Sequence, residues 1–133
     1  RIYLLSTNTR CREPIFNDFA LGRLVVAHFR AAQDQGFADS LAWVVMPDHF
    51  HWLIELRRGT LSGLIQRTKS LSTKAVNLSS VRQISLWQNG FHDRALRREE
   101  DLVKIARYVV ANPLRLGLVE KLCDYPLWDA ICV

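Results

Sequence analysis

The stretch Met46-Pro47-Asp48-His49-Phe50-His51-Trp52-Leu53-Ile54-Glu55 decides how the chain is expected to fold. Read as a β-strand, it places His49 and His51 on one face and points Phe50 and Trp52 into a core, because side chains alternate with period two. Two imidazoles about 7 Å apart along a strand can converge on one metal ion. The alternative is a pair of unrelated surface histidines on a half-buried strand.

The composition is that of a globular protein, with 133 residues, 49% apolar residues and 23% charged residues. This length predicts one domain over residues 1–133. The cysteines Cys11, Cys123 and Cys132 form no CxxC pair and are odd in number, which favours free thiols in a reducing compartment over a zinc knuckle. No apolar run is long enough to span a membrane and no signal peptide is visible, so we expect a cytoplasmic protein without membrane contact.

Strands and helices alternate around the histidine stretch in a recognisable order. We expect strands at 2–6, 41–46, 49–55 and 91–96, and helices over 19–35, after Thr60 and over 99–111. Pro47 and Asp48 form a tight connection, so the two central strands should pair as an antiparallel hairpin. The order βαββαβ, followed by a helix, matches a ferredoxin-like α+β fold. Its antiparallel sheet would carry helices on one face, plus a C-terminal helix.

Charge is distributed unevenly along the chain. The net charge is +5, and the run from Leu56 to His92 contains no Asp or Glu while it contains several Arg and Lys. A basic block of one sign that also holds hydrophobic residues indicates a surface for a phosphate backbone. The residues predicted to contact DNA are Arg57, Arg58, Arg67, Lys69, Lys74 and Arg82 within this run, and Arg97 beyond it.

The last predicted helix carries a second candidate site. Tyr108 and Asn112 are four residues apart, hence on one helix face, rotated roughly 100° from the core stripe. The helix should stop before Pro113, because the residue before a proline avoids helical dihedrals. The alternative is a boundary tyrosine packed by its ring and an asparagine that merely ends the helix.

Together these stretches resemble the HUH-type single-tyrosine transposases, and most closely the REP-associated tyrosine transposases of bacteria. The resemblance covers almost the whole chain and rests on three motifs in the expected order, which are residues 45–54 (VMPDHFHWLI), 86–93 (LWQNGFHD) and 108–119 (YVVANPLRLGLV). One departure is Asp48, where the family commonly has Asn.

The resemblance implies an enzyme of defined chemistry. His49, His51 and Asn112 would bind a divalent metal ion, Mg²⁺ or Mn²⁺, and Tyr108 would be the nucleophile. The reaction would be cleavage and strand transfer of single-stranded DNA at hairpin-forming palindromic repeats through a covalent 5′-phosphotyrosine. A monomer is favoured by the palindrome-associated branch, although insertion-sequence relatives are commonly dimers.

Two other functions fit the same charge pattern. A non-catalytic DNA-hairpin-binding or regulatory protein could keep the fold, but it need not keep His49, His51, Tyr108 and Asn112 together. A metal-dependent RNA nuclease gives no reason for a tyrosine beside the metal. For His92 we expect a structural or substrate-contact role and not metal ligation, and Glu55 is either an outer group of the site or a surface acid.

Overall fold

The computed structural model describes residues 1–97 and 100–131, so Glu99 and Cys132 of the sequence analysis lie outside the described residues. The strands are β1 (Ile2–Asn8), β2 (Ala38–Met46), β3 (His49–Leu56), β4 (His92–Leu96) and β5 (Trp128–Ala130). The helices are α1 (Phe19–Asp34), α2 (Leu61–Ser79), α3 (Glu100–Val110) and α4 (Asn112–Arg115), with 3₁₀ turns η1 (Arg10–Arg12), η2 (Ile15–Asn17) and η3 (Leu122–Asp124).

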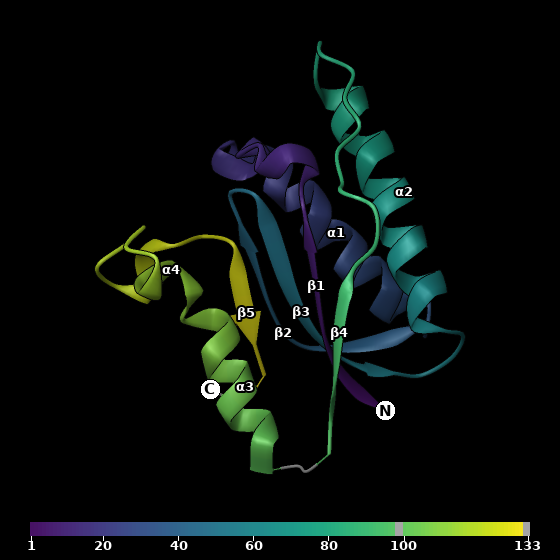
Figure 1. The fold of residues 1–133 in the computed structure, drawn as a ribbon, viewed down its shortest axis with the longest axis vertical. Coiled ribbons are helices and arrows are strands. Elements are labelled where there is room, and N and C mark those ends of the chain that lie inside the picture. Colours follow the sequence, from purple (N-terminus) through teal and green to yellow (C-terminus); the bar gives the residue numbers. More distant parts are fainter. Residues whose placement is uncertain (98–99, 132–133) are drawn as a thin grey trace.

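The five strands form one antiparallel sheet in the order β4-β1-β3-β2-β5 (Figure 1). The first four positions of this order are the ferredoxin-like arrangement predicted from the sequence, so the α+β fold class is confirmed. The short edge strand β5 was not predicted. It pairs with β2 and extends the sheet by one strand.

Local sequence signals place the helix starts where they were expected. Asp18 caps α1 by accepting a hydrogen bond from the Ala20 N–H, and Thr60 caps α2 by accepting from the Gly63 N–H. The last long helix, α3, ends at Val110, one residue earlier than predicted. A second short helix, α4, follows at once with Pro113 in its first turn, where the missing proline N–H costs no hydrogen bond.

One face of the sheet is closed by α1. Phe29 of α1 stacks on Trp52 with ring centroids 4.4 Å apart and meets Phe50 edge-on at 5.0 Å. The Trp52 Nε1–H is satisfied by the Ser40 hydroxyl at 2.8 Å. The central hairpin is thereby fixed in register, because a slip of one residue would move these aromatic rings to the opposite face.

The opposite face is covered on one side by α3, which contacts β2, β3 and β5. Val44 and Leu53 point to this face and are fully buried. In Figure 1, α3 lies beside β5, away from α1 and α2, which pack against each other. The histidines of β3 therefore lie on the α3 side of the sheet. None of the helices in the described ranges is long and apolar enough to cross a bilayer.

Candidate active site at the paired histidines

His49 and His51 lie on the same face of β3, as the alternation predicted, with their ring centroids 5.1 Å apart and their planes at 80°. Both side chains are largely shielded from solvent. In the sheet register, His51 is flanked by Val44 of β2 and Ser6 of β1. The two imidazoles therefore form a compact pair at the centre of the sheet.

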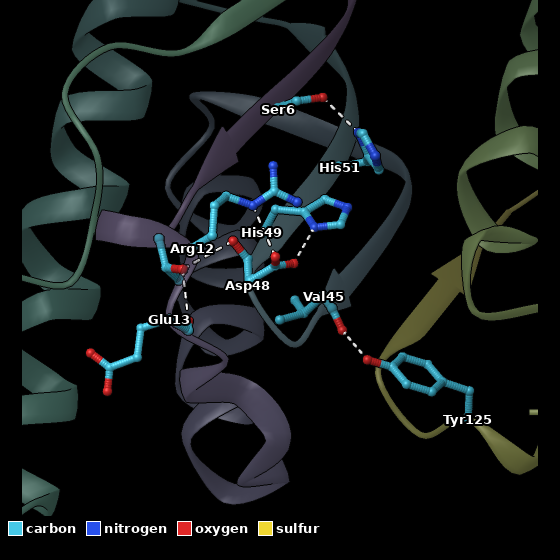
Figure 2. A network of polar contacts seen from close by, with 9 residues as sticks. Ser6, Arg12, Glu13, Val45, Asp48, His49, His51 and Tyr125 are labelled. Atoms are coloured by element: carbon cyan, nitrogen blue, oxygen red, sulfur yellow. Dashed lines mark hydrogen bonds and ion pairs between the residues drawn. The ribbon is translucent and has the colours of Figure 1, made fainter. Parts of the chain in front are cut away.

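Each imidazole is held by its Nδ1 atom. His49 Nδ1 lies 2.7 Å from the Asp48 Oδ1 atom, and His51 Nδ1 lies 2.6 Å from the Ser6 hydroxyl (Figure 2). Burial, and to a lesser extent the charges of His49 and Arg115, lower the pKa of His51 to about 4. His51 is therefore neutral near pH 7, which is the form of imidazole that binds metal ions.

The turn before His49 is fixed by the segment that follows β1. The Thr9 N–H donates to the Asp48 carbonyl at 2.8 Å, and the Phe16 N–H donates to the Pro47 carbonyl at 2.9 Å. The Arg12 Nε–H donates to the Asp48 carboxylate at 2.9 Å. Burial raises the pKa of Asp48, but the hydrogen bonds from Arg12 and His49 outweigh it, and the net effect is a lowered pKa. Asp48 is therefore a carboxylate near neutral pH.

Tyr108 lies near the end of α3 with 53% of its surface exposed. The Arg115 guanidinium lies 3.8 Å above the centre of its ring, and Arg115 Nη1 donates to the Tyr108 carbonyl at 2.6 Å. The charge of Arg115 also contributes to the lowered pKa of His51. The structure thus places a half-exposed phenol on α3, the helix that packs on the histidine face of the sheet.

Asn112 is the first residue of α4 and is 6% exposed. Its Nδ2 atom is buried and has no hydrogen-bond partner among the described residues. Over the same residues, no three His, Cys, Asp or Glu side chains gather closely enough to hold a metal ion. A third ligand to the histidine pair would have to be of another type, and a carboxamide oxygen such as that of Asn112 is a suitable donor, whereas the unpaired Nδ2 atom is a hydrogen-bond donor that does not bind metal ions. The donor set is therefore compatible with a divalent ion.

The predicted DNA-contact residues are scattered and most have protein partners. Arg57 pairs with Asp39, and Arg82 pairs with Glu13 through both guanidinium nitrogens at 2.6 and 2.8 Å. Lys69 donates to the carbonyls of Gln88 and Gly90.

The remaining members of this set are disposed differently. Arg58 and Arg67 both lie over the Phe37 ring at the C-terminal end of α1, and both donate to Gln35. Lys74 on α2 and Arg97 after β4 are exposed. Fewer cations of this set are therefore free to contact a phosphate backbone than the sequence suggests.

A row of residues across the sheet extends the site toward its edge. His92 of β4 pairs directly with Ser6, which in turn pairs with His51, so all three side chains lie on one face. His92 and Arg94 are exposed on this side of β4. Glu55 lies at the other end of β3, 3.4 Å from Arg57, and this contact supports its reading as a surface acid.

Four residues around the site were given no role in it from the sequence. Ser6 and Asp48 contact the histidines, Arg12 contacts Asp48, and Arg115 contacts the tyrosine. Arg115 is seven residues after Tyr108, a spacing that places two residues on one helix face, but Pro113 between them hid this signal. The other three depend on strand register and turn conformation.

An antiparallel α+β fold with two histidines on its central strand and a tyrosine on a later helix is the arrangement on which the resemblance to the single-tyrosine transposases rests. The chain belongs to the family described as "Transposase IS200 like", whose model matches residues 3–112. It is 31% identical over 87 residues to a REP-associated tyrosine transposase of Escherichia coli strain K12, a match covering 64% of this chain and 50% of that protein. The chain spans about half the length of the curated relatives it matches.

The fold agrees with a solved structure of the same kind. A REP-associated tyrosine transposase bound to a REP hairpin superposes with a TM-score of 0.78 and 23% sequence identity, over 96% of this chain and 74% of that one. At this identity, the likeness establishes the fold. The resemblance inferred from the three sequence motifs is therefore confirmed at the level of family and fold.

Proposed function

We propose that this chain is a metal-dependent endonuclease and strand-transferase for single-stranded DNA, acting beside hairpin-forming palindromic repeats. The observation that carries the proposal is the His49–His51 pair, with both Nδ1 atoms engaged by the protein and a solvent-accessible tyrosine on α3, the helix that packs on the same face of the sheet. Membership in the transposase family and the hairpin bound by the structural relative support the choice of reaction and substrate.

His49, His51 and Asn112 would hold the divalent ion, Mg²⁺ or Mn²⁺. When bound, this ion supplies Lewis-acid stabilisation of the negative charge on a phosphodiester. The protein orients the two imidazoles through Asp48 and Ser6 so that their Nε2 atoms are not occupied by these contacts. Arg115 adds a positive charge next to the tyrosine, which favours an anionic substrate there.

The phenolic oxygen of Tyr108 would attack the phosphorus atom of the scissile phosphodiester. A bond forms between that oxygen and phosphorus while the bond to the 3′-oxygen breaks, and the phenolic proton is lost as the leaving 3′-oxygen gains one. The products are a 5′-phosphotyrosine and a free 3′-OH. Attack of a 3′-OH on the phosphotyrosine reverses these steps and joins strands without ATP.

The decisive experiment replaces Tyr108 with Phe. The change removes one oxygen from a half-exposed residue, so we expect an unchanged fold and unchanged DNA binding. Labelled hairpin DNA with single-stranded flanks, incubated with protein and Mn²⁺, should give a covalent adduct with the wild type on a denaturing gel. Tyr108→Phe should give neither cleavage nor adduct.

Two controls complete this experiment. Tyr3→Phe removes a hydroxyl from a partly buried tyrosine of β1 and should cleave like the wild type. His51→Ala should bind the hairpin but fail to cleave it. Persistent cleavage by Tyr108→Phe would show that water is the nucleophile and would overturn the proposal. Hairpin binding without any wild-type cleavage would point instead to a non-catalytic hairpin-binding protein.

A further inference from the structure

Asp48 lies between Arg12 and His49 at the turn that begins β3 (Figure 2). We infer that Asp48, itself oriented by Arg12, is a positioning residue that fixes the His49 imidazole in the tautomer with its proton on Nδ1 and its lone pair on Nε2. The tautomer itself can be measured without any ligand. Its consequence, a histidine prepared to bind a metal ion, rests on the proposed function.

Each oxygen of the Asp48 carboxylate has its own partner. Oδ1 lies 2.7 Å from His49 Nδ1, and Oδ2 accepts from Arg12 Nε at 2.9 Å. An ionised carboxylate can only accept hydrogen bonds, so His49 Nδ1 must carry the proton in this contact. The lone pair of a neutral His49 is then on Nε2. A hydroxyl can donate or accept, so Ser6 does not constrain His51 in the same way.

An unusual backbone conformation at Arg12 accompanies its contact with Asp48. Cys11 and Arg12 have φ values of 56° and 54°, a left-handed conformation that is uncommon and strained for residues other than glycine. The Thr9 hydroxyl anchors this segment by hydrogen bonds to the Glu13 carbonyl at 2.8 Å and the Asp48 carbonyl at 3.1 Å. The strained turn is therefore hydrogen-bonded to Asp48, the residue that the Arg12 side chain also contacts.

Replacing Asp48 with Asn tests this arrangement, because the side chain keeps its shape while one of its two oxygen acceptors becomes an NH₂ donor. Arg12 is a cationic donor and selects the carboxamide oxygen, since charge-assisted hydrogen bonds are the stronger ones. The NH₂ group of the carboxamide then faces His49 Nδ1, which must become an acceptor. Asp48→Asn should therefore move the His49 proton from Nδ1 to Nε2.

The first measurement is ¹⁵N NMR of the metal-free protein at a pH where His49 is neutral, with the two ring nitrogens of His49 distinguished by their chemical shifts. We expect a protonated Nδ1 in the wild type and a protonated Nε2 in Asp48→Asn. In Arg12→Ala/Asp48→Asn the carboxamide is free to turn, so the Nδ1-protonated form should return at least in part. A wild-type Nε2–H tautomer, or unchanged His49 shifts in Asp48→Asn, would overturn the inference.

The matched control is Asp39→Asn, which neutralises another strand aspartate paired with an arginine, Arg57, at the far end of the hairpin. Its His49 shifts should equal those of the wild type. The second measurement titrates Mn²⁺ alone and follows the free ion by electron paramagnetic resonance. Asp48→Ala, which leaves His49 Nδ1 without its acceptor, should weaken Mn²⁺ binding by roughly 10- to 100-fold, as is typical for the loss of a group that orients a ligating histidine, whereas Asp39→Asn should not.

The two proposals fail in different ways. If the tautomer changes as expected but the wild type never forms a DNA adduct, the inference stands and the proposed reaction is wrong. If the wild type forms the adduct but Asp48→Asn leaves the His49 shifts unchanged and Asp48→Ala leaves the Mn²⁺ affinity unchanged, the reaction stands and the inference is wrong. Chemical-shift maps of the backbone amides show whether each variant keeps the fold.

Discussion

Arg115 reaches back across the α3–α4 junction and contacts Tyr108 twice. Its guanidinium lies 3.8 Å above the ring centre, and its Nη1 atom donates to the Tyr108 carbonyl at 2.6 Å. Since the tyrosine is about half exposed, packing restricts its ring only in part. We predict that Arg115 holds Tyr108 in the side-chain rotamer from which it attacks DNA, so that Arg115→Ala slows cleavage without preventing it.

The magnitude follows from the contacts that are lost. Only the contact with the ring depends on the rotamer of Tyr108, and a cation–π contact at an exposed site contributes about 0.5–1 kcal/mol. If this contact is what favours one rotamer of Tyr108 over the other staggered ones, its loss lowers the population of that rotamer about 2- to 5-fold. The rate of adduct formation at saturating DNA should fall by the same factor.

Single-turnover adduct formation on hairpin DNA measures this rate, and fluorescence anisotropy measures DNA affinity separately. Arg115→Lys keeps the charge but loses the planar stacking group, so we expect an intermediate rate. Arg107→Ala, which removes an exposed arginine from the last turn of α3, is the matched control and should react like the wild type. An Arg115→Ala rate equal to that of the wild type, or a loss confined to DNA affinity, would refute the reasoning.

Two further predictions concern DNA binding and stability. Lys74→Glu, on the exposed side of α2, should weaken hairpin binding and reduce the slope of log affinity against log salt by roughly 0.9 for the lost phosphate contact. Arg57→Glu should change that slope less, because Asp39 and Glu55 already neutralise Arg57; equal slopes for both variants and the wild type would show that neither cation meets DNA. The second concerns Tyr125, whose hydroxyl donates to the Val45 carbonyl at 2.6 Å and whose pKa burial raises to about 12. An unfolded tyrosine titrates near pH 10, so the stability that this phenol contributes is present below about pH 10 and is lost as pH rises toward 12. Urea unfolding should show Tyr125→Phe about 1 kcal/mol less stable at pH 7 and less sensitive to alkali than the wild type; the same alkaline loss in both proteins would contradict this.

The fold could be predicted because its signals are local. The alternation from His49 to Trp52, the tight connection before it and the capping residue Thr60 are each readable within a few residues of sequence. The edge strand β5 is different, since Trp128–Ala130 is only three residues long and extended only because it pairs with β2. Short edge pairings of this kind leave little periodicity to detect.

The features of the site likewise divide into those that local sequence predicts and those that depend on tertiary contacts. That His49 and His51 share a face follows from strand geometry alone, and the structure bears it out. The contact between Ser6 and His51 requires the register of β1 against β3, across 45 residues of sequence. The contact between Arg12 and Asp48 requires a left-handed turn at two residues that are not glycine, which no propensity predicts.

The basic run shows why charge counted along the sequence overstates a binding surface. It contains no acid of its own, but the chain supplies acids from elsewhere, Glu13 to Arg82 and Asp39 to Arg57, each tens of residues away or across the hairpin. A cation already paired in the protein has less to gain from a phosphate, because it must give up one partner for another. Besides Lys74 and Arg97, the exposed side chains that can meet DNA include Arg94 and His92, which lie across β1 from the histidine pair, on the face of the sheet that α3 partly covers. A single strand that crosses this open edge would reach the paired histidines along the sheet, whereas one bound only to α2 would lie on the opposite face. Binding of the single-stranded DNA beside the hairpin is therefore expected to depend more on β4 than on α2, the helix that carries most of the basic run.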